Sequence, residues 1–145
     1  MDINVTGPWL LSRAVVPLMA AKREGRIINI GSITGKRPLP NRSPYCASKM
    51  ALLGLTRSLA LEVGPQNITV NCISPGAVNS PRLEMLAKNA GMPLEELLKR
   101  AAEGSALERV CQPSDVAALC VFLAGPGAAN ITGQDINVDA GTFMD

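Results

Sequence analysis

Apolar residues recur at three- and four-residue steps between Ser43 and Val63, and this spacing predicts a long amphipathic helix. The apolar positions are Ala51, Leu52, Leu55, Leu59 and Val63. We expect Ser43 to cap the first free N–H groups, and Pro44 suits the first helical turn. Gly64 is expected to end the helix in a left-handed conformation, because the proline that follows it cannot continue a helix.

Three short runs rich in β-branched residues, at 26–30, 68–73 and 134–138, are typical of strands. Gly31 and Ser32 follow the first run, and Pro75 and Gly76 follow the second. Strands that alternate with helices predict an α/β fold with a parallel sheet. Residues that follow such strands lie at the carboxyl edge of the sheet, where open α/β sheets bind ligands.

Four further segments are expected to be helical. The first begins after Val5, with Leu10, Leu11, Ala14, Val15, Leu18 and Met19 as its apolar face. Pro17 lies inside that helix and is expected to kink it or to remove a hydrogen bond. The others cover residues 82–90, 93–103 and 113–124, and residues 31–42 are expected to form a loop.

Composition is that of one globular domain: the chain has 145 residues, 47% of them hydrophobic and 18% charged. A net charge of +2 without a basic run gives no support for nucleic-acid binding. The apolar stretches are too short to cross a membrane, and residues 1–20 do not resemble a secretory leader. The four cysteines lack metal-ligand spacing, so we expect reduced thiols, no metal site and a cytoplasmic protein.

Tyr45 and Lys49 are the candidate chemical pair. The chain has no histidine, which excludes Ser-His-Asp hydrolysis and histidine-ligated metals. Tyr45 is the only tyrosine, and Lys49 projects beside it one helical turn later. An ammonium favours the phenolate form of a neighbouring phenol, which can then exchange a proton with a substrate oxygen. Taken alone, Tyr-x-x-x-Lys is a weak signal that favours a solvated surface pair, because any exposed helix can show it.

Other motifs accompany this pair in a fixed order. They are Asn4-Val5-x-Gly7, Ile30-Gly31-Ser32, Tyr45-x-x-x-Lys49, Val70-Asn71-x-x-x-Pro75-Gly76 and Ile131-Thr132-Gly133-Gln134, with Val138-Asp139 near the end. With these motifs the chain resembles the short-chain dehydrogenase/reductase family, and most of all the bacterial-type 3-oxoacyl-carrier-protein reductases and related sugar and polyol dehydrogenases. The resemblance implies a Rossmann-type, doubly wound parallel sheet.

The resemblance also implies an activity: NAD- or NADP-dependent interconversion of a small-molecule carbonyl and a secondary alcohol. Tyr45 would be the general acid and base, Lys49 would bind the nicotinamide ribose, Ser32 would hold the substrate oxygen, and Asn4 would complete a proton relay. Tyr45, Lys49, Pro75, Gly76, Val78 and Ser80 would contact the cofactor. Residues 80–104 would form a substrate lid, and the protein would be a homo-oligomer, a dimer or tetramer.

One expected motif is missing from the sequence. No glycine-rich turn of the dinucleotide-binding kind occurs, so residues 1–145 are expected to form a single truncated Rossmann-like domain without the N-terminal βαβ cofactor half. The strand at 26–30 would then be an open sheet edge. The alternative function is an inactive fragment or an assembly module. Trp9, Leu10 and Leu59 could form its contact surface or could be core.

Overall fold

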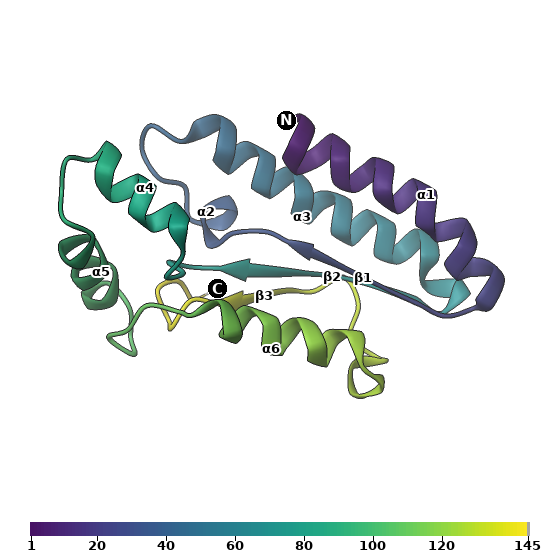
Figure 1. The fold of residues 1–145 in the computed structure, drawn as a ribbon. Helices are drawn as coiled ribbons and strands as arrows, with labels where there is room; N and C mark the ends of the chain where they lie inside the picture. Colours follow the sequence, from purple (N-terminus) through teal and green to yellow (C-terminus); the bar gives the residue numbers. More distant parts are fainter. Residues whose placement is uncertain (145) are drawn as a thin grey trace.

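Three parallel strands form the centre of the computed structural model, which describes residues 1–144. The sheet has the order β1 (Gly25–Ile30), β2 (Ile68–Pro75) and β3 (Asp135–Val138). Ile27 lies beside Val70 in the first ladder, and Ile73 lies beside Ile136 in the second. The α/β fold with a parallel sheet that the sequence predicts is confirmed (Figure 1).

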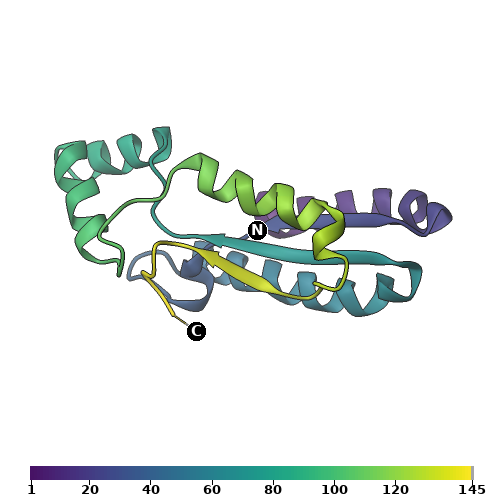
Figure 2. The ribbon, with the colours of Figure 1, turned by 90° about the horizontal axis from the view of Figure 1, so that it is seen from below.

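Helices cover both faces of this sheet. α1 (Gly7–Lys22) and α3 (Ser43–Val63) lie on one face, and α6 (Pro113–Ala124) lies on the other (Figures 1 and 2). α4 (Pro81–Asn89) and α5 (Leu94–Glu103) lie beyond the carboxyl ends of the strands (Figure 1). The short elements are η1 (Asp2–Thr6), α2 (Ile33–Lys36), η2 (Gly64–Gln66) and η3 (Pro126–Ala128).

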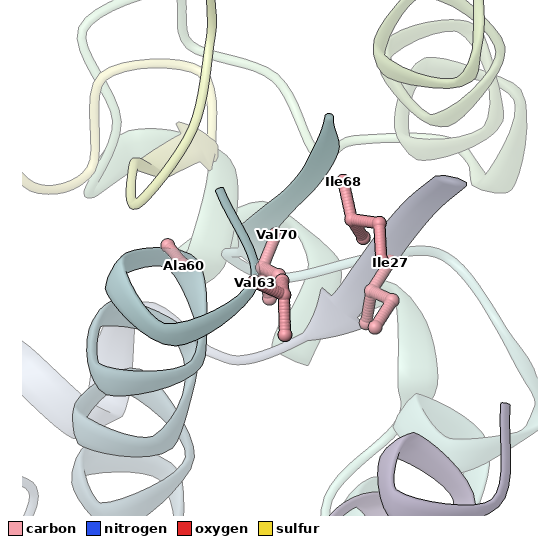
Figure 3. Packing of buried hydrophobic residues seen from close by; sticks show 5 residues of the cluster. All are labelled: Ile27, Ala60, Val63, Ile68 and Val70. Carbon is pink, nitrogen blue, oxygen red and sulfur yellow. The ribbon is translucent and has the colours of Figure 1, made fainter. Parts of the chain in front are cut away.

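The two faces of the sheet carry separate hydrophobic cores. On the α3 side, Ala60 and Val63 pack with Ile27, Ile68 and Val70 (Figure 3). On the α6 side, the fully buried Leu123 packs with Ile73 and Ala128. Alternate residues of a strand point to opposite faces, so β2 contributes to both cores and is buried along most of its length.

Asn71 is a buried polar residue that ties β2 to the segment before β3. Its side-chain amide donates to the Ile131 carbonyl at 2.7 Å, and its side-chain oxygen accepts from the Gln134 N–H at 3.1 Å. Asn71 is only 1% exposed, so its own amide has little access to water and depends on these two backbone partners. Asn71 thus connects two of the motifs that the sequence analysis identified.

The region predicted as a loop at residues 31–42 contains the short helix α2, so that prediction was wrong in part. Ser32 is the N-cap residue of α2, and the Ser32 hydroxyl accepts a hydrogen bond from the Thr34 N–H at 3.2 Å. The cap holds the chain in a helical turn directly after β1. The prolines at 38 and 40 come after this helix and do not interrupt it.

Both predicted end signals of the long helix need correction. Arg42, not Ser43, is the N-cap residue of α3, and no side chain caps this end. Gly64 keeps a right-handed conformation because the chain continues into the 3-10 turn η2. The left-handed position is Asn67, with a φ of 63°. There its side chain donates to the Arg23 carbonyl at 2.8 Å.

The predicted apolar face of the first helix was only partly right. Val15 and Met19 do pack on the core, together with Val16 and Ala20. Leu10, Leu11 and Leu18 instead are exposed, because α1 rests on the sheet along one narrow side. α1 continues without a break through Pro17. Of the helices in residues 1–144, none has both the length and the apolar character that a bilayer span requires.

We predict that Asn71→Leu destabilises the fold although leucine is apolar and of similar size. The Ile131 carbonyl and the Gln134 N–H would each lose a partly buried hydrogen bond, and each loss is expected to lower the free energy of unfolding by about 0.5–1.5 kcal/mol. Urea unfolding followed by circular dichroism measures the change. Asn89→Leu, at an exposed position of α4, is the control and should shift stability by no more than about 0.5 kcal/mol. Equal stability of both variants would contradict the assigned role of Asn71.

Candidate active site

A cavity of about 670 Å³ opens at the carboxyl end of the sheet. Its walls come from the ends of β1 and β2 and from α2, α3, α4 and α5. All of the site residues predicted from the sequence line this one cavity: Asn4, Ser32, Tyr45, Lys49, Pro75, Gly76, Val78 and Ser80. They come from segments far apart in the chain, and the parallel sheet brings them together. Their chemical roles stay predictions.

Tyr45 and Lys49 project side by side from the first turns of α3. The Lys49 Nζ lies 5.8 Å from the centroid of the Tyr45 ring. The same ammonium donates to the Ile30 carbonyl at 2.8 Å, so it is fixed at the carboxyl end of β1. Lys49 therefore places a positive charge between the phenol and the sheet edge, in a partly buried position.

Ser32 is held by its own helix turn. Its hydroxyl and that of Thr34 share a hydrogen bond of 2.8 Å, in addition to the cap contact with the Thr34 N–H. A hydroxyl can accept two hydrogen bonds and donate one, so Ser32 can still bind an oxygen in the cavity when Thr34 donates. Thr34 also lines the cavity, and the sequence analysis did not single it out. The signal available was its spacing, two residues after a serine at a strand end.

Asn4 reaches α3 through its side chain. The Asn4 Nδ2 donates to the Ser48 Oγ at 3.1 Å, and the Ser48 Oγ donates to the Tyr45 carbonyl at 2.7 Å. Ser48, buried at 2% exposure, links η1 to the turn that carries Tyr45 and was missed from the sequence. The resemblance assigns Asn4 a relay role through its backbone. The hydrogen bond found here engages its side chain and connects η1 to α3, and the relay role of its backbone stays a prediction.

The loop after β2 is pinned at several points. The Gly76 N–H donates to the Val138 carbonyl at 3.0 Å, and the Cys111 N–H donates to the Ala77 carbonyl at 3.1 Å. The Ser80 hydroxyl donates to the Val78 carbonyl at 3.2 Å, so it is already engaged within the loop. These contacts fix the backbone of the loop along one side of the cavity.

Two glycines of the motifs are explained by close packing. A Cβ at Gly76 would come within 2.7 Å of the Asp139 Cβ. A Cβ at Gly31 would come within 2.7 Å of the Cys72 Sγ and 2.8 Å of the Ser74 Oγ. A side chain at either position would push the end of one strand away from its neighbour, so both glycines keep the carboxyl edge compact.

Some apolar residues of the region proposed as a lid face the cavity and others do not. Leu86 and Leu97 line the cavity, whereas Met85 is 53% exposed and Met92 does not line it. Four arginines also line the cavity: Arg37, Arg42, Arg82 and Arg100. The Arg82 guanidinium carbon lies 5.3 Å from the Tyr45 ring centroid. From the sequence, Arg37 and Arg42 were expected to be solvated, with contact to an anionic substrate as the alternative, whereas Arg82 and Arg100 were not singled out.

A buried polar cluster lies beneath the cavity. Lys36 Nζ is 3.2 Å from an Asp135 carboxylate oxygen, and the Ser74 Oγ donates to the other carboxylate oxygen at 2.6 Å. Cys72 lies beside this cluster. Burial raises the pKa of the Cys72 thiol to about 12, and the negative charge of Asp135 acts in the same direction.

Comparison with known proteins gives a family match over residues 1–142, to the family described as enoyl-(acyl carrier protein) reductase. Dehydrogenase/reductase SDR family member 4 of Homo sapiens is 40% identical over 98% of this chain and 49% of its own length. The 3-oxoacyl-[acyl-carrier-protein] reductase FabG of Rickettsia prowazekii is 38% identical over 99% of this chain and 57% of its own length. The chain thus spans about half the length of these relatives.

Solved structures also match nearly all of this chain with about half of their own length. A crystal structure of actinorhodin polyketide ketoreductase with NADPH superposes with a TM-score of 0.87 at 36% identity, over 96% of this chain and 56% of that one. YwfH, an NADPH-dependent reductase of bacilysin biosynthesis, gives a TM-score of 0.91 at 30% identity over 97% of this chain and 56% of its own. The sheet and helices described above therefore occur in solved reductases.

We predict that Cys72 resists alkylation in the folded protein. Only the thiolate is nucleophilic, and a pKa raised from 9.0 to about 12 keeps this thiol protonated at mildly alkaline pH. Iodoacetamide followed by peptide mass mapping should modify the partly exposed Cys120 first and Cys72 only on unfolding. The raised pKa favours the fold below pH 9, and this contribution disappears as the pH rises from 9 toward 12. Equal labelling rates at the two cysteines would contradict the prediction.

Proposed function

We propose, since this chain belongs to the short-chain dehydrogenase/reductase family, that it interconverts a carbonyl group and a secondary alcohol with NAD or NADP as cofactor. The observation that supports this most strongly is the meeting of Ser32, Tyr45 and Lys49 in one cavity. The three residues come from two different elements at the carboxyl edge of a parallel sheet, where ligands bind in such folds.

Tyr45 is the proposed proton donor. In the reductive direction its hydroxyl gives a proton to the carbonyl oxygen, and in the oxidative direction the phenolate takes the proton back. The Lys49 ammonium, 5.8 Å from the ring centroid, stabilises the negative charge that forms on the phenol. Its hydrogen bond to the Ile30 carbonyl holds it in place throughout.

Ser32 is the proposed binder of the substrate oxygen. A hydroxyl fixed by a helix cap and by Thr34 needs little reorganisation when charge develops on that oxygen. Asn4 acts in this proposal through Ser48, by holding the turn that carries Tyr45. It is a positioning residue, because its side-chain amide is engaged away from the reacting atoms.

The residues of the cavity fit one end of a dinucleotide. Lys49 and the fixed backbone from Gly76 to Val78 would hold the nicotinamide and its ribose. When bound, the reduced nicotinamide supplies the hydride that the carbonyl carbon receives. The sequence contains no glycine-rich turn for the pyrophosphate, so the fit covers the nicotinamide end alone. The matched ketoreductase structure contains NADPH, which agrees with such a cofactor.

An assembly role is the second candidate function. Within residues 1–144, β1 pairs with β2 alone, and a groove of about 400 Å³ runs between β1 and α1. Leu11 and Leu18 on α1 are 69% and 68% exposed, and Trp9 and Leu10 are about half exposed. Leu59 packs against the α3-side core and does not contribute to this surface. An open edge beside exposed leucines favours association with a second copy of the chain.

We predict that Tyr45→Phe removes catalysis while leaving the fold intact. The variant keeps the ring, so it is expected to lower kcat by about 10²- to 10⁴-fold with little change in KM. The assay follows oxidation of NADPH or NADH by the purified chain with a panel of small ketones. Retained turnover in the variant would contradict the role of Tyr45, and a folded parent chain that neither binds the nucleotides nor turns over would contradict the catalytic proposal.

A matched pair of lysine variants tests the second residue. Lys49→Met removes the charge beside Tyr45, and we expect a loss of at least about tenfold in kcat. Lys99→Met is the control, because Lys99 is highly exposed on α5 and pairs only weakly with Glu103 at 3.9 Å. Equal effects of the two substitutions would show that Lys49 has no special part in the reaction.

The assembly candidate predicts reversible self-association. Sedimentation velocity over a range of concentrations should show a dimer or larger species, and Leu11→Lys with Leu18→Lys should shift it toward the monomer. Leu107→Lys is the control, since Leu107 is 58% exposed and lies outside α1. A parent chain that sediments as a monomer at every concentration would exclude this candidate.

A further inference from the structure

Charge around the candidate active site is strongly one-sided. Five cationic residues line the cavity: Arg37, Arg42, Lys49, Arg82 and Arg100. No aspartate or glutamate among residues 1–144 lines it. The whole sequence has 14 basic and 12 acidic residues, so the basic excess at this cavity exceeds the net charge of +2 of the chain. A cleft lined by one sign of charge attracts ligands of the opposite sign.

We propose that the substrate of this site carries an anionic group, a carboxylate or a phosphate, and that Arg42 and Arg82 bind it. This inference rests on the proposed carbonyl and alcohol chemistry and adds the class of substrate.

Three of the five cations already have partners in the protein. Lys49 donates to the Ile30 carbonyl at 2.8 Å, and Arg37 donates to the Thr142 carbonyl at 3.1 Å. Arg100 forms an ion pair with Glu96 one turn earlier on α5. Arg42 and Arg82 form no ion pair with any carboxylate of residues 1–144. An anion in the cavity would therefore meet two guanidinium groups whose charge is not neutralised.

Arg82 is held next to the reacting group. It lies in the first turn of α4, and its guanidinium carbon is 5.3 Å from the Tyr45 ring centroid. A contact with an aromatic ring uses the charge of a guanidinium without using its N–H donors. Those donors form a planar fork that matches both oxygens of a carboxylate or phosphate. An anion bound there would lie within a few bonds of a carbonyl at Tyr45.

Arg42 approaches the same cavity from another direction. It is the N-cap residue of α3, three positions before Tyr45, and it is partly buried. Its backbone is fixed because its carbonyl accepts from the Cys46 N–H at 2.9 Å. Arg42, at the N-cap of α3, and Arg82, in the first turn of α4, therefore line the same cavity as Tyr45.

The remaining wall of the cavity is apolar. Leu83, Leu86 and Leu97 line it from α4 and α5, and Leu39 lines it from the segment before α3. A substrate with a short hydrocarbon segment between its carbonyl and its anionic group would satisfy both kinds of surface. The site is thus suited to keto acids, or to phosphorylated ketones and the corresponding alcohols.

Matched ligand pairs that differ in charge test the proposal. Acetoacetate and the isosteric, neutral acetoacetamide form the carboxylate pair, and dihydroxyacetone phosphate and dihydroxyacetone form the phosphate pair. Binding to the purified chain is measured by ligand-observed NMR at neutral pH. We expect one anion or both to bind at least about tenfold more tightly than the neutral partner, and the preference to fall as salt rises. The pair with the larger ratio identifies the anionic group.

Arginine variants locate the effect. Arg42→Gln and Arg82→Gln should each lower the charge preference severalfold, and the double variant should bring the ratio near one. Arg57→Gln is the control, because Arg57 is exposed on α3 and does not line the cavity. Adenosine diphosphate is the comparison probe for the phosphates of a cofactor. A loss of its binding in the Arg82 variant, with no charge preference among the ketones, would assign the arginines to the cofactor and overturn the proposal.

The binding readout separates this inference from the catalytic one. Tyr45→Phe should keep the preference for anions, since neither arginine depends on the phenolic hydroxyl. A chain that shows the preference but no turnover would contradict the proposed reaction and leave the substrate class standing. The inference is wrong if neither anion binds, or if both bind no more tightly than their neutral partners. It is also wrong if Arg57→Gln lowers the preference for anions as much as Arg82→Gln does.

Discussion

Parallel pairing of β1, β2 and β3 places three carboxyl ends on one edge of the sheet, and the candidate site depends on this alignment. Each ladder is fixed by hydrogen bonds and by side chains that fit only one face. Ile27 beside Val70 faces the α3-side core, whereas Ile73 beside Ile136 faces the α6-side core. A shift by one residue would reverse these faces, so the hydrophobic pattern of the strands also sets the height at which Ser32 and the loop after β2 emerge.

A buried ion pair connects β3 to α2, the short helix that begins after Ser32. Lys36, in α2, pairs with Asp135 at the start of β3, with side chains 10% and 3% exposed. Such a pair adds little stability after desolvation, but breaking it would leave a buried charge. Since α2 begins at the Ser32 cap, the pair ties the position of this serine to β3. The sequence gives no direct sign of this contact, because its partners are about 100 positions apart.

β1 borders two different surfaces, the candidate active-site cavity and the groove beside α1. The cavity is lined by residues of α2, α3, α4 and α5, and we propose that it holds the nicotinamide end of a dinucleotide. The groove beside β1 is apolar and borders an unpaired strand edge within residues 1–144. A parallel strand that is buried on both faces is normally paired on both edges as well. The same β1 therefore supports the cavity at its carboxyl end and has one unpaired edge within residues 1–144, where we propose association.

Local sequence predicted the three strands, the long helices and the candidate site residues, but not the short helix α2. Periodicity predicted the α3 helix and the buried strands, and the motifs pointed to Ser32, Tyr45 and Lys49 because strand ends and helical turns have fixed geometry. Only the tertiary structure decided which face of α1 is buried, that Gly64 stays right-handed, and that the Arg82 guanidinium lies beside Tyr45. These features depend on how helices pack against a sheet and on contacts between distant segments, and no local pattern of residues encodes them.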